Sequence, residues 1–77
     1  MPEYIFQAVQ LGLDGAEHFV CHESDFHAAD LESAIVTANA LLEVIPVSDQ
    51  CNMIQVLGLD RDLLWRRPID AFEHTNH

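Results

Sequence analysis

The stretch from His18 to His27, HFVCHESDFH, places three histidines, one cysteine and two carboxylates within ten positions. Imidazole, thiolate and carboxylate groups bind zinc and serve as nucleophiles, acids and bases in catalytic sites. On a helix, His18 and His22 would lie one turn apart and could bind the same zinc ion. The Phe-Val-Cys triplet between them favours a strand instead, in which the two histidines are about 13 Å apart and cannot share an ion.

Strand alternation would place Cys21 and His22 on opposite faces, which excludes a thiolate–imidazole pair formed by these neighbours. His22, Asp25 and His27 could still converge in a loop before the helix, so a weak metal site remains an alternative. Glu23 and Asp25 lack the apolar surroundings that raise the pKa of one carboxyl group of a catalytic pair. We therefore interpret the stretch as a strand leaving a sheet, and we expect no catalytic residue, no metal and no cofactor.

The two cysteines, Cys21 and Cys51, form no CxxC motif. The opening MPEYIF lacks the basic and apolar pattern expected of a signal peptide, and the sequence has no apolar run of the roughly 18 residues that cross a membrane. We therefore expect a cytosolic protein that does not bind membranes. In that compartment the sequence predicts two buried free thiols, with a Cys21–Cys51 pair as the alternative.

Charge is the most unusual property of the sequence. The net charge is −10, there is no lysine, and residues 1–60 hold ten acids without a single Lys or Arg. Such a field repels phosphate backbones and attracts basic protein surfaces, although acidity also serves solubility. We therefore expect a protein partner with a basic surface and no direct contact with nucleic acid. The densest acids are the predicted partner-binding residues: Glu23, Asp25, Asp30 and Glu32.

The pattern of apolar residues predicts an α+β domain over residues 1–68, followed by a polar tail, 69–77, that we expect to fray. Its elements follow the order β-β-α-β-β, with one amphipathic helix on one face of a small, mostly antiparallel sheet. The expected elements are strands 3–11, 17–21, 52–59 and 63–67, a turn at 13–15, and a helix from Leu31 to Ile45 that Asp30 caps and Pro46 ends.

The helix has one apolar face, on which we expect Leu31, Ile35, Ala38, Leu42 and Ile45. Both faces of the sheet are rich in apolar residues, and an uncovered apolar face marks an interface. We therefore predict a homodimer or a protein partner on the sheet. The expected interface residues are Ile5, Val9, Val20, Ile54, Val56 and Leu64. Arg66 is expected to pair with a carboxylate of the first or second strand.

Three resemblances add to this interpretation. M-P-x-Y-x-F at the start, DLESAIVTANALLE, and IQVLGLDRDLLWRRP resemble a family of small uncharacterised proteobacterial proteins, which implies the same fold and no site residues. DG at 14–15, DF at 25–26 and the same helix resemble the core of HicB-type antitoxins, which neutralise a basic ribonuclease. In size, acidity and α+β plan, the chain is similar to phage anti-CRISPR proteins.

The sequence thus predicts a non-enzymatic, inhibitor-type module that docks on a basic, nucleic-acid-binding surface, as an anti-CRISPR protein does. The alternatives are a HicB-like antitoxin that neutralises a small ribonuclease, and an enzyme accessory protein or weak metal binder.

Overall fold

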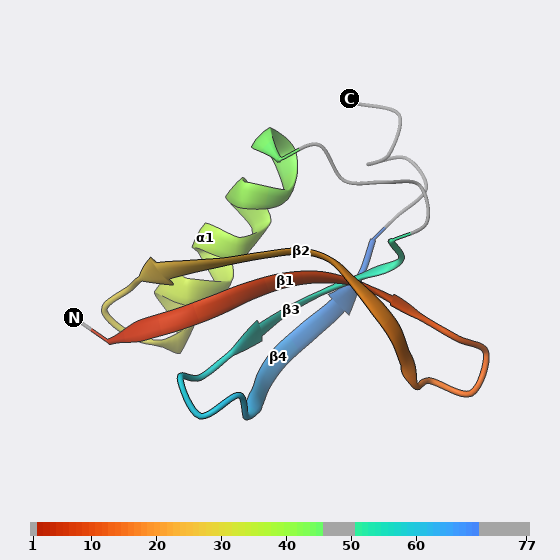
Figure 1. Cartoon of the computed structure of the whole chain (residues 1–77). Helices are drawn as coiled ribbons and strands as arrows, with labels where there is room; N and C mark the ends of the chain where they lie inside the picture. The colour runs from red at the N-terminus through yellow and green to blue at the C-terminus, as the bar shows by residue number, and fades with distance from the viewer. Residues whose placement is uncertain (1, 46–50, 70–77) are drawn as a thin grey trace.

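The computed structural model describes residues 2–45 and 51–69, which form a four-stranded antiparallel sheet with one helix packed on one face (Figure 1). The strand order is β2-β1-β3-β4, so the first and third strands are central. The elements are β1 (Glu3–Leu11), β2 (Glu17–His27), α1 (Leu31–Val44), β3 (Met53–Leu57) and β4 (Leu63–Pro68). The predicted α+β class and the order β-β-α-β-β are confirmed.

β2 is longer than the sequence predicted, because it continues through HESDFH to His27. It pairs with β1 along that whole length, from Leu11 opposite Glu17 to Glu3 opposite His27. The alternative in which His22, Asp25 and His27 converge in a loop before the helix is therefore wrong. The physical reason is that burial alternates along this segment: Ser24 and Phe26 are half-buried, while Glu23, Asp25 and His27 are exposed. Such alternation is typical of an edge strand with one solvent-exposed face.

The β1–β2 hairpin contains two register shifts, between Ala8 and Val9 and between Gln10 and Leu11. At the first, His22 lies opposite Ala8 and Val20 opposite Val9, so Cys21 is an extra residue in β2.

The extra residue changes which side chains share a face. Cys21 packs against the core, and the ring of the next residue, His22, lies 6.0 Å from the buried ring of Phe6. The predicted placement of Cys21 and His22 on opposite faces is therefore wrong, because a bulge interrupts the alternation. Bulges also increase strand twist, and Figure 1 shows the hairpin bending along its length.

The turn of this hairpin and the start of α1 follow their predicted chemistry. Gly15 has φ +82°, the left-handed conformation expected of the residue in this turn. Asp30 is the N-cap of α1, and its Oδ1 accepts a hydrogen bond from the Ser33 backbone N–H at 2.8 Å. At the other end, Ile45 is extended, and Pro46, which was expected to end the helix, lies outside the described residues.

The helix turns a slightly different stripe toward the sheet than the one predicted. Ala34, Ala38 and Leu42 are buried, while Leu31 and Ile45 are half-buried and pack against the core. Ile35, expected at the centre of the face, is only half-buried and lies outside the core cluster. Small residues at the centre of the stripe let a helix backbone approach a sheet closely, which hydrophobicity alone does not indicate. The core cluster consists of Tyr4, Phe6, Ala8, Ala28, Ala34, Ala38, Leu42, Cys51, Ile54, Val56 and Ile69.

Cys21 and Cys51 form a disulfide, so the prediction of two free thiols is wrong. Their Cα atoms are 6.3 Å apart, within the range that a disulfide spans. The bulge turns Cys21 toward the core, where Cys51 is buried just before β3 begins. The pairing depends on that bulge, which the alternation pattern does not reveal.

The predicted boundary of the tail is also wrong, because Ile69 belongs to the core. Its side chain is buried, and its backbone N–H donates to the carbonyl of Asn52 at 3.0 Å. The rest of the tail that was expected to fray, 70–77, lies outside the described residues. No helix in the described ranges is long and apolar enough to cross a membrane.

Candidate functional site: a polar row on the open face of the sheet

The open face is the face of the sheet opposite α1, and it carries a polar row with one side chain from each strand. Strand register places Glu23 of β2 opposite Gln7 of β1, Gln7 opposite Gln55 of β3, and Gln55 opposite Arg66 of β4. Gln7 and Gln55 lie in the two central strands and are only 4% and 1% exposed. Buried amides are costly to desolvate unless they are hydrogen-bonded, so the row must satisfy them.

Hydrogen bonds join the four side chains in one direction. Arg66 Nη2 donates to Gln55 Oε1 at 2.9 Å, and Gln55 Nε2 donates to Gln7 Oε1 at 2.8 Å. Gln7 Nε2 then donates to Glu23 Oε1 at 2.6 Å. The chain thus runs from a cation to an anion, an arrangement in which aligned dipoles strengthen one another.

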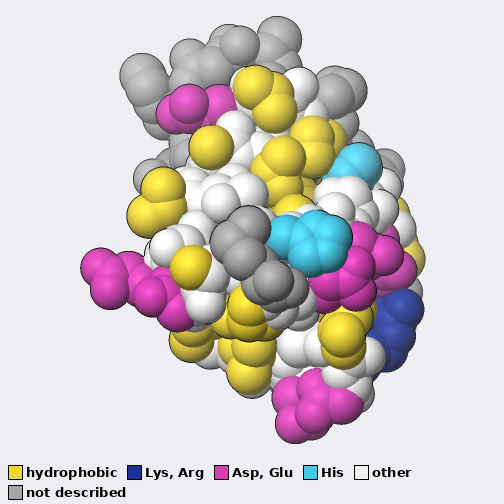
Figure 2. Space-filling model, turned by 90° about the vertical axis from the view of Figure 1, so that its left-hand side faces the viewer, with side chains coloured by type: hydrophobic (Ala, Val, Ile, Leu, Met, Phe, Trp, Pro, Cys, Tyr) yellow, Lys and Arg dark blue, Asp and Glu magenta, His cyan; other side chains and the backbone are white. Residues whose placement is uncertain are grey.

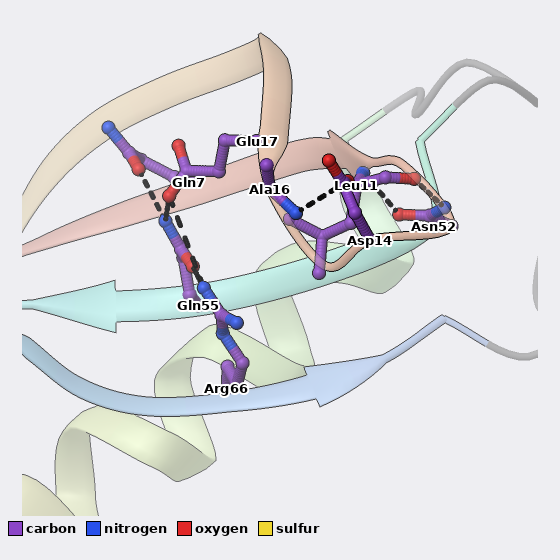
Figure 3. Close-up of polar contacts among 8 residues, drawn as sticks. All are labelled: Gln7, Leu11, Asp14, Ala16, Glu17, Asn52, Gln55 and Arg66. Carbon is purple, nitrogen blue, oxygen red and sulfur yellow. Dashed lines mark hydrogen bonds and ion pairs between the residues drawn. The ribbon is translucent and has the colours of Figure 1, made fainter.

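Two further charged residues join the ends of the row (Figure 3 shows the part around Gln55). Glu17 Oε2 accepts a bond from Gln55 Nε2 at 3.2 Å and lies 4.0 Å from Arg66 Nη2. At the other end, Arg61 donates from both Nη atoms to the two oxygens of Glu23 at 3.3 Å. The predicted contact between Arg66 and a carboxylate of the first two strands therefore exists, with Glu17 of β2 as the carboxylate.

The turn between β3 and β4 places Arg61 over the row. Gly58 N–H donates to the Asp62 carbonyl, and Arg61 N–H donates to the Gly58 carbonyl, which closes a short hairpin loop. Arg61 has φ +68°, the left-handed region that normally favours glycine or asparagine. An arginine at this strained position is held toward Glu23.

The contact between Arg61 and Glu23 shifts the pKa of both residues. Hydrogen bonds from Arg61, and then from Gln7, lower the pKa of Glu23 below its usual 4.5. The same hydrogen bonds raise the pKa of Arg61 above its usual value. The formal charges of the row and its two added residues sum to zero, because two are carboxylates and two are guanidinium groups: Glu17, Glu23, Arg61 and Arg66.

Beside this row the open face is hollowed by a cavity of about 330 Å³. β2 contributes Glu17 and Val20 to its lining, and the two central strands contribute Gln7, Gln55 and Leu57. Its lining residues are Gln7, Glu17, Val20, Gln55, Leu57, Arg61, Leu63 and Arg66. The hollow is thus lined by polar side chains and by aliphatic side chains from three strands.

The six residues predicted as a sheet-face interface do not lie together on that face. Ile54 and Val56 are fully buried in the core cluster with Phe6, on the side of α1. The β1–β3 register pairs Phe6 with Val56, so Ile54 and Val56 lie on the face of Phe6, whereas the prediction placed them on the face of Ile5 and Val9. The other four residues differ in exposure: Ile5 and Val9 are buried, and Val20 and Leu64 are exposed.

The four predicted partner-binding acids have different surroundings. Glu23 is bound to Arg61 and Gln7, and Asp30 caps α1, where the backbone N–H of Ser33 lowers its pKa below the usual 3.8. Asp25 and Glu32 are exposed. Figure 2 shows acidic side chains at separate places on one side of the molecule, and basic side chains only at one edge of that view.

The histidines of the opening stretch are not gathered around one point. His27 Nε2 lies 3.1 Å from Glu3 Oε1, and His22 Nε2 is buried with no hydrogen-bond partner among the described residues. Within residues 2–45 and 51–69, no group of three or more His, Cys, Asp or Glu side chains is placed to hold a metal ion. The side chain of His18 is outside the described part of the chain.

Sequence reasoning missed Gln7, Gln55 and Glu17, which carry the polar row. A signal was available, because Gln7 and Gln55 each interrupt an apolar strand at its centre. A polar residue there indicates either a wet face or a buried hydrogen-bond partner. No family model, curated protein or solved structure matches the chain. What the protein does is therefore inferred from its own residues and contacts.

Proposed function

We propose that this protein is a non-enzymatic inhibitor module whose acidic surface docks on a basic, nucleic-acid-binding surface of a protein partner. The observation that supports this proposal is that every arginine of the chain is engaged internally. Arg61 binds Glu23, Arg66 binds Gln55, and Arg67 donates to Asn39 Oδ1 at 2.7 Å and to the Pro68 carbonyl.

The acids outnumber these cations by ten, and many are exposed, including Asp14, Asp25, Glu32 and Glu43. A partner approaching the molecule therefore meets a strongly negative field with its positive charges held in local contacts. Such a field accelerates association with a basic surface and repels nucleic acid. Carboxylates on a rigid sheet and helix can also replace phosphates at the basic side chains of the partner.

The experiment is affinity capture from the host, followed by identification of the bound protein and measurement of association at rising salt. We expect a nucleic-acid-binding protein, binding that weakens as salt rises, and competition by the nucleic acid of that partner. A CRISPR effector as the captured protein would support the anti-CRISPR-like form of the proposal, and a small ribonuclease the HicB-like form. A partner with no basic surface, or binding that salt does not affect, would refute both.

Matched charge reversals locate the contact. Asp25→Lys with Glu32→Lys removes two exposed acids from the predicted site and should slow association. Glu43→Lys with Asp62→Lys makes the same change in net charge at two other exposed positions. If both pairs slow association equally, only net charge matters and the proposed site is wrong.

The homodimer expected from the sequence remains a prediction. Among the six residues named for it, Val20 and Leu64 are exposed and available for such a contact. Val20→Glu should convert a dimer to a monomer in light scattering after size exclusion. A monomeric wild-type protein at high concentration would contradict the prediction.

A further inference from the structure

The hollow on the open face contains a cation and an anion that stand side by side without a hydrogen bond between them. Arg66 Nη2 and Glu17 Oε2 are 4.0 Å apart, beyond hydrogen-bond distance. Their side chains are 35% and 44% exposed, so both reach solvent at the hollow. Among the described residues, neither Arg66 Nη1 nor Glu17 Oε1 makes a hydrogen bond, so each group keeps capacity for a ligand.

A single buried amide holds both groups in place. Gln55 Oε1 accepts from Arg66, while Gln55 Nε2 donates to Glu17, and Gln7 in turn fixes the amide of Gln55. Gln55 is 1% exposed, so this support is rigid and protected from water. Groups held in this way lose little freedom when a ligand binds.

The charges of the hollow select against ligands that carry a net charge. A simple anion would meet Glu17 in the lining as well as the field of a protein with net charge −10. A simple cation would meet Arg61 and Arg66. A zwitterion lying antiparallel to the Glu17–Arg66 pair places each of its charges against the opposite one, which gives charge-assisted hydrogen bonds at both ends.

The remaining surface of the hollow is aliphatic. Val20, Leu57 and Leu63 line it, and Val20 and Leu63 are 44% and 48% exposed. An aliphatic group that covers them would remove apolar area from water. The volume of about 330 Å³ lies at the lower end of the range for small-molecule sites.

We infer that the hollow between Glu17, Arg66 and the aliphatic side chains of Val20, Leu57 and Leu63 binds a small zwitterion with an apolar side chain, the class of free aliphatic α-amino acids. The ligand carboxylate binds the Arg66 guanidinium, the ligand ammonium group binds the Glu17 carboxylate, and its side chain covers the aliphatic residues. This inference does not depend on the proposed inhibitor function.

The experiment is a titration of the wild-type protein with L-leucine, followed by the NMR signals of the Gln7 and Gln55 side-chain amides. We expect saturable shifts at millimolar ligand. L-leucinamide, which lacks the carboxylate, and N-acetyl-L-leucine, which lacks the ammonium group, should each bind at least tenfold more weakly. Equal binding of all three compounds, or no saturable shift with leucine, would overturn the inference.

Variants provide an independent check. Glu17→Gln and Arg66→Gln should each weaken leucine binding tenfold or more, whereas Glu43→Gln, which makes the same charge change as Glu17→Gln at an exposed helix position, should not alter it. Backbone amide spectra establish whether each variant is folded. If a variant does not fold, the comparison of the three ligands on the wild-type protein still tests the inference. If Glu17→Gln binds leucine as the wild type does, the assigned pairing is wrong.

Discussion

Gln7 and Gln55 face each other across the two central strands, with Gln55 Nε2 donating to Gln7 Oε1 at 2.8 Å, and both side chains are buried. Two amides in the middle of a sheet are tolerable only because each binds the other and a charged neighbour. The pair therefore couples the strands β1 and β3 to the ionic groups at both sides of the row.

Gln55→Leu should destabilise the protein by about 2 kcal/mol, because Gln7 Oε1, Arg66 and Glu17 all lose a partner. Adding Gln7→Leu should cost less than the sum of the single changes, since the two apolar side chains then meet without an orphaned amide. Urea unfolding of the four proteins in this cycle measures the coupling. Gln10→Leu, at a half-buried position of β1, is the control, and additive costs for the pair would contradict the coupling.

The disulfide should contribute substantially to stability. It joins residues 30 positions apart, for which loop closure predicts about 3 to 4 kcal/mol. Dithiothreitol should therefore lower the melting temperature of the wild type, while the double variant Cys21→Ala/Cys51→Ala should melt lower and be unaffected by the reductant. A wild-type melting temperature that does not respond to full reduction would contradict this prediction.

The local elements could be predicted from the sequence, because their signals are local. Residues 3–11 alternate as a strand, Asp30 has the side chain of an N-cap, and Gly15 supplies the left-handed turn residue. Each of these depends on the few residues around it. The fold class followed from their order.

The features that could not be predicted are those set by how neighbouring strands pair. The phase of β3 depends on its register with β1, and one step of register exchanges the faces of Ile54, Gln55 and Val56. Likewise, the bulge at Cys21 can be recognised only when the register of β2 with β1 is known. Both the disulfide and the placement of His22 follow from this bulge. The polar row was missed because it is a product of register in all three strand pairs.

The pKa of Glu23 should respond to Arg61. Its hydrogen bonds hold the pKa below 4.5, so the contact contributes stability above the unfolded-state value and loses it as pH falls through the lower folded-state value. Arg61→Gln should raise the pKa of Glu23 in an NMR titration of its carboxyl carbon. Asp30 is an internal control, because its pKa is lowered by Ser33 and should not move. An unchanged Glu23 pKa in the variant would show that Arg61 is not the main cause.

The positive φ of Arg61 predicts which substitutions at this position give the more stable protein. Arg61→Gly relieves the left-handed strain and loses an exposed ion pair, effects that oppose each other, so stability should change little. Arg61→Val loses the same ion pair and adds β-branched strain, so it should be clearly less stable than Arg61→Gly. Thermal melting of the two variants decides the order. If Arg61→Val is at least as stable as Arg61→Gly, the turn does not constrain this residue.

The buried stripe of α1 can be distinguished from the stripe that the sequence predicted. Ala38 is fully buried, so Ala38→Asp places an unpaired charge in the core and should cost about 3 kcal/mol or more. Val36 is 66% exposed, and Val36→Asp should leave stability nearly unchanged, because the two residues have similar helix propensities. Ile35 is half-buried and outside the core cluster, so Ile35→Asp should fall between them, whereas the sequence-based face would make it as damaging as Ala38→Asp. Urea unfolding of the three variants orders them, and a loss at Ile35 equal to that at Ala38 would favour the face centred on Ile35.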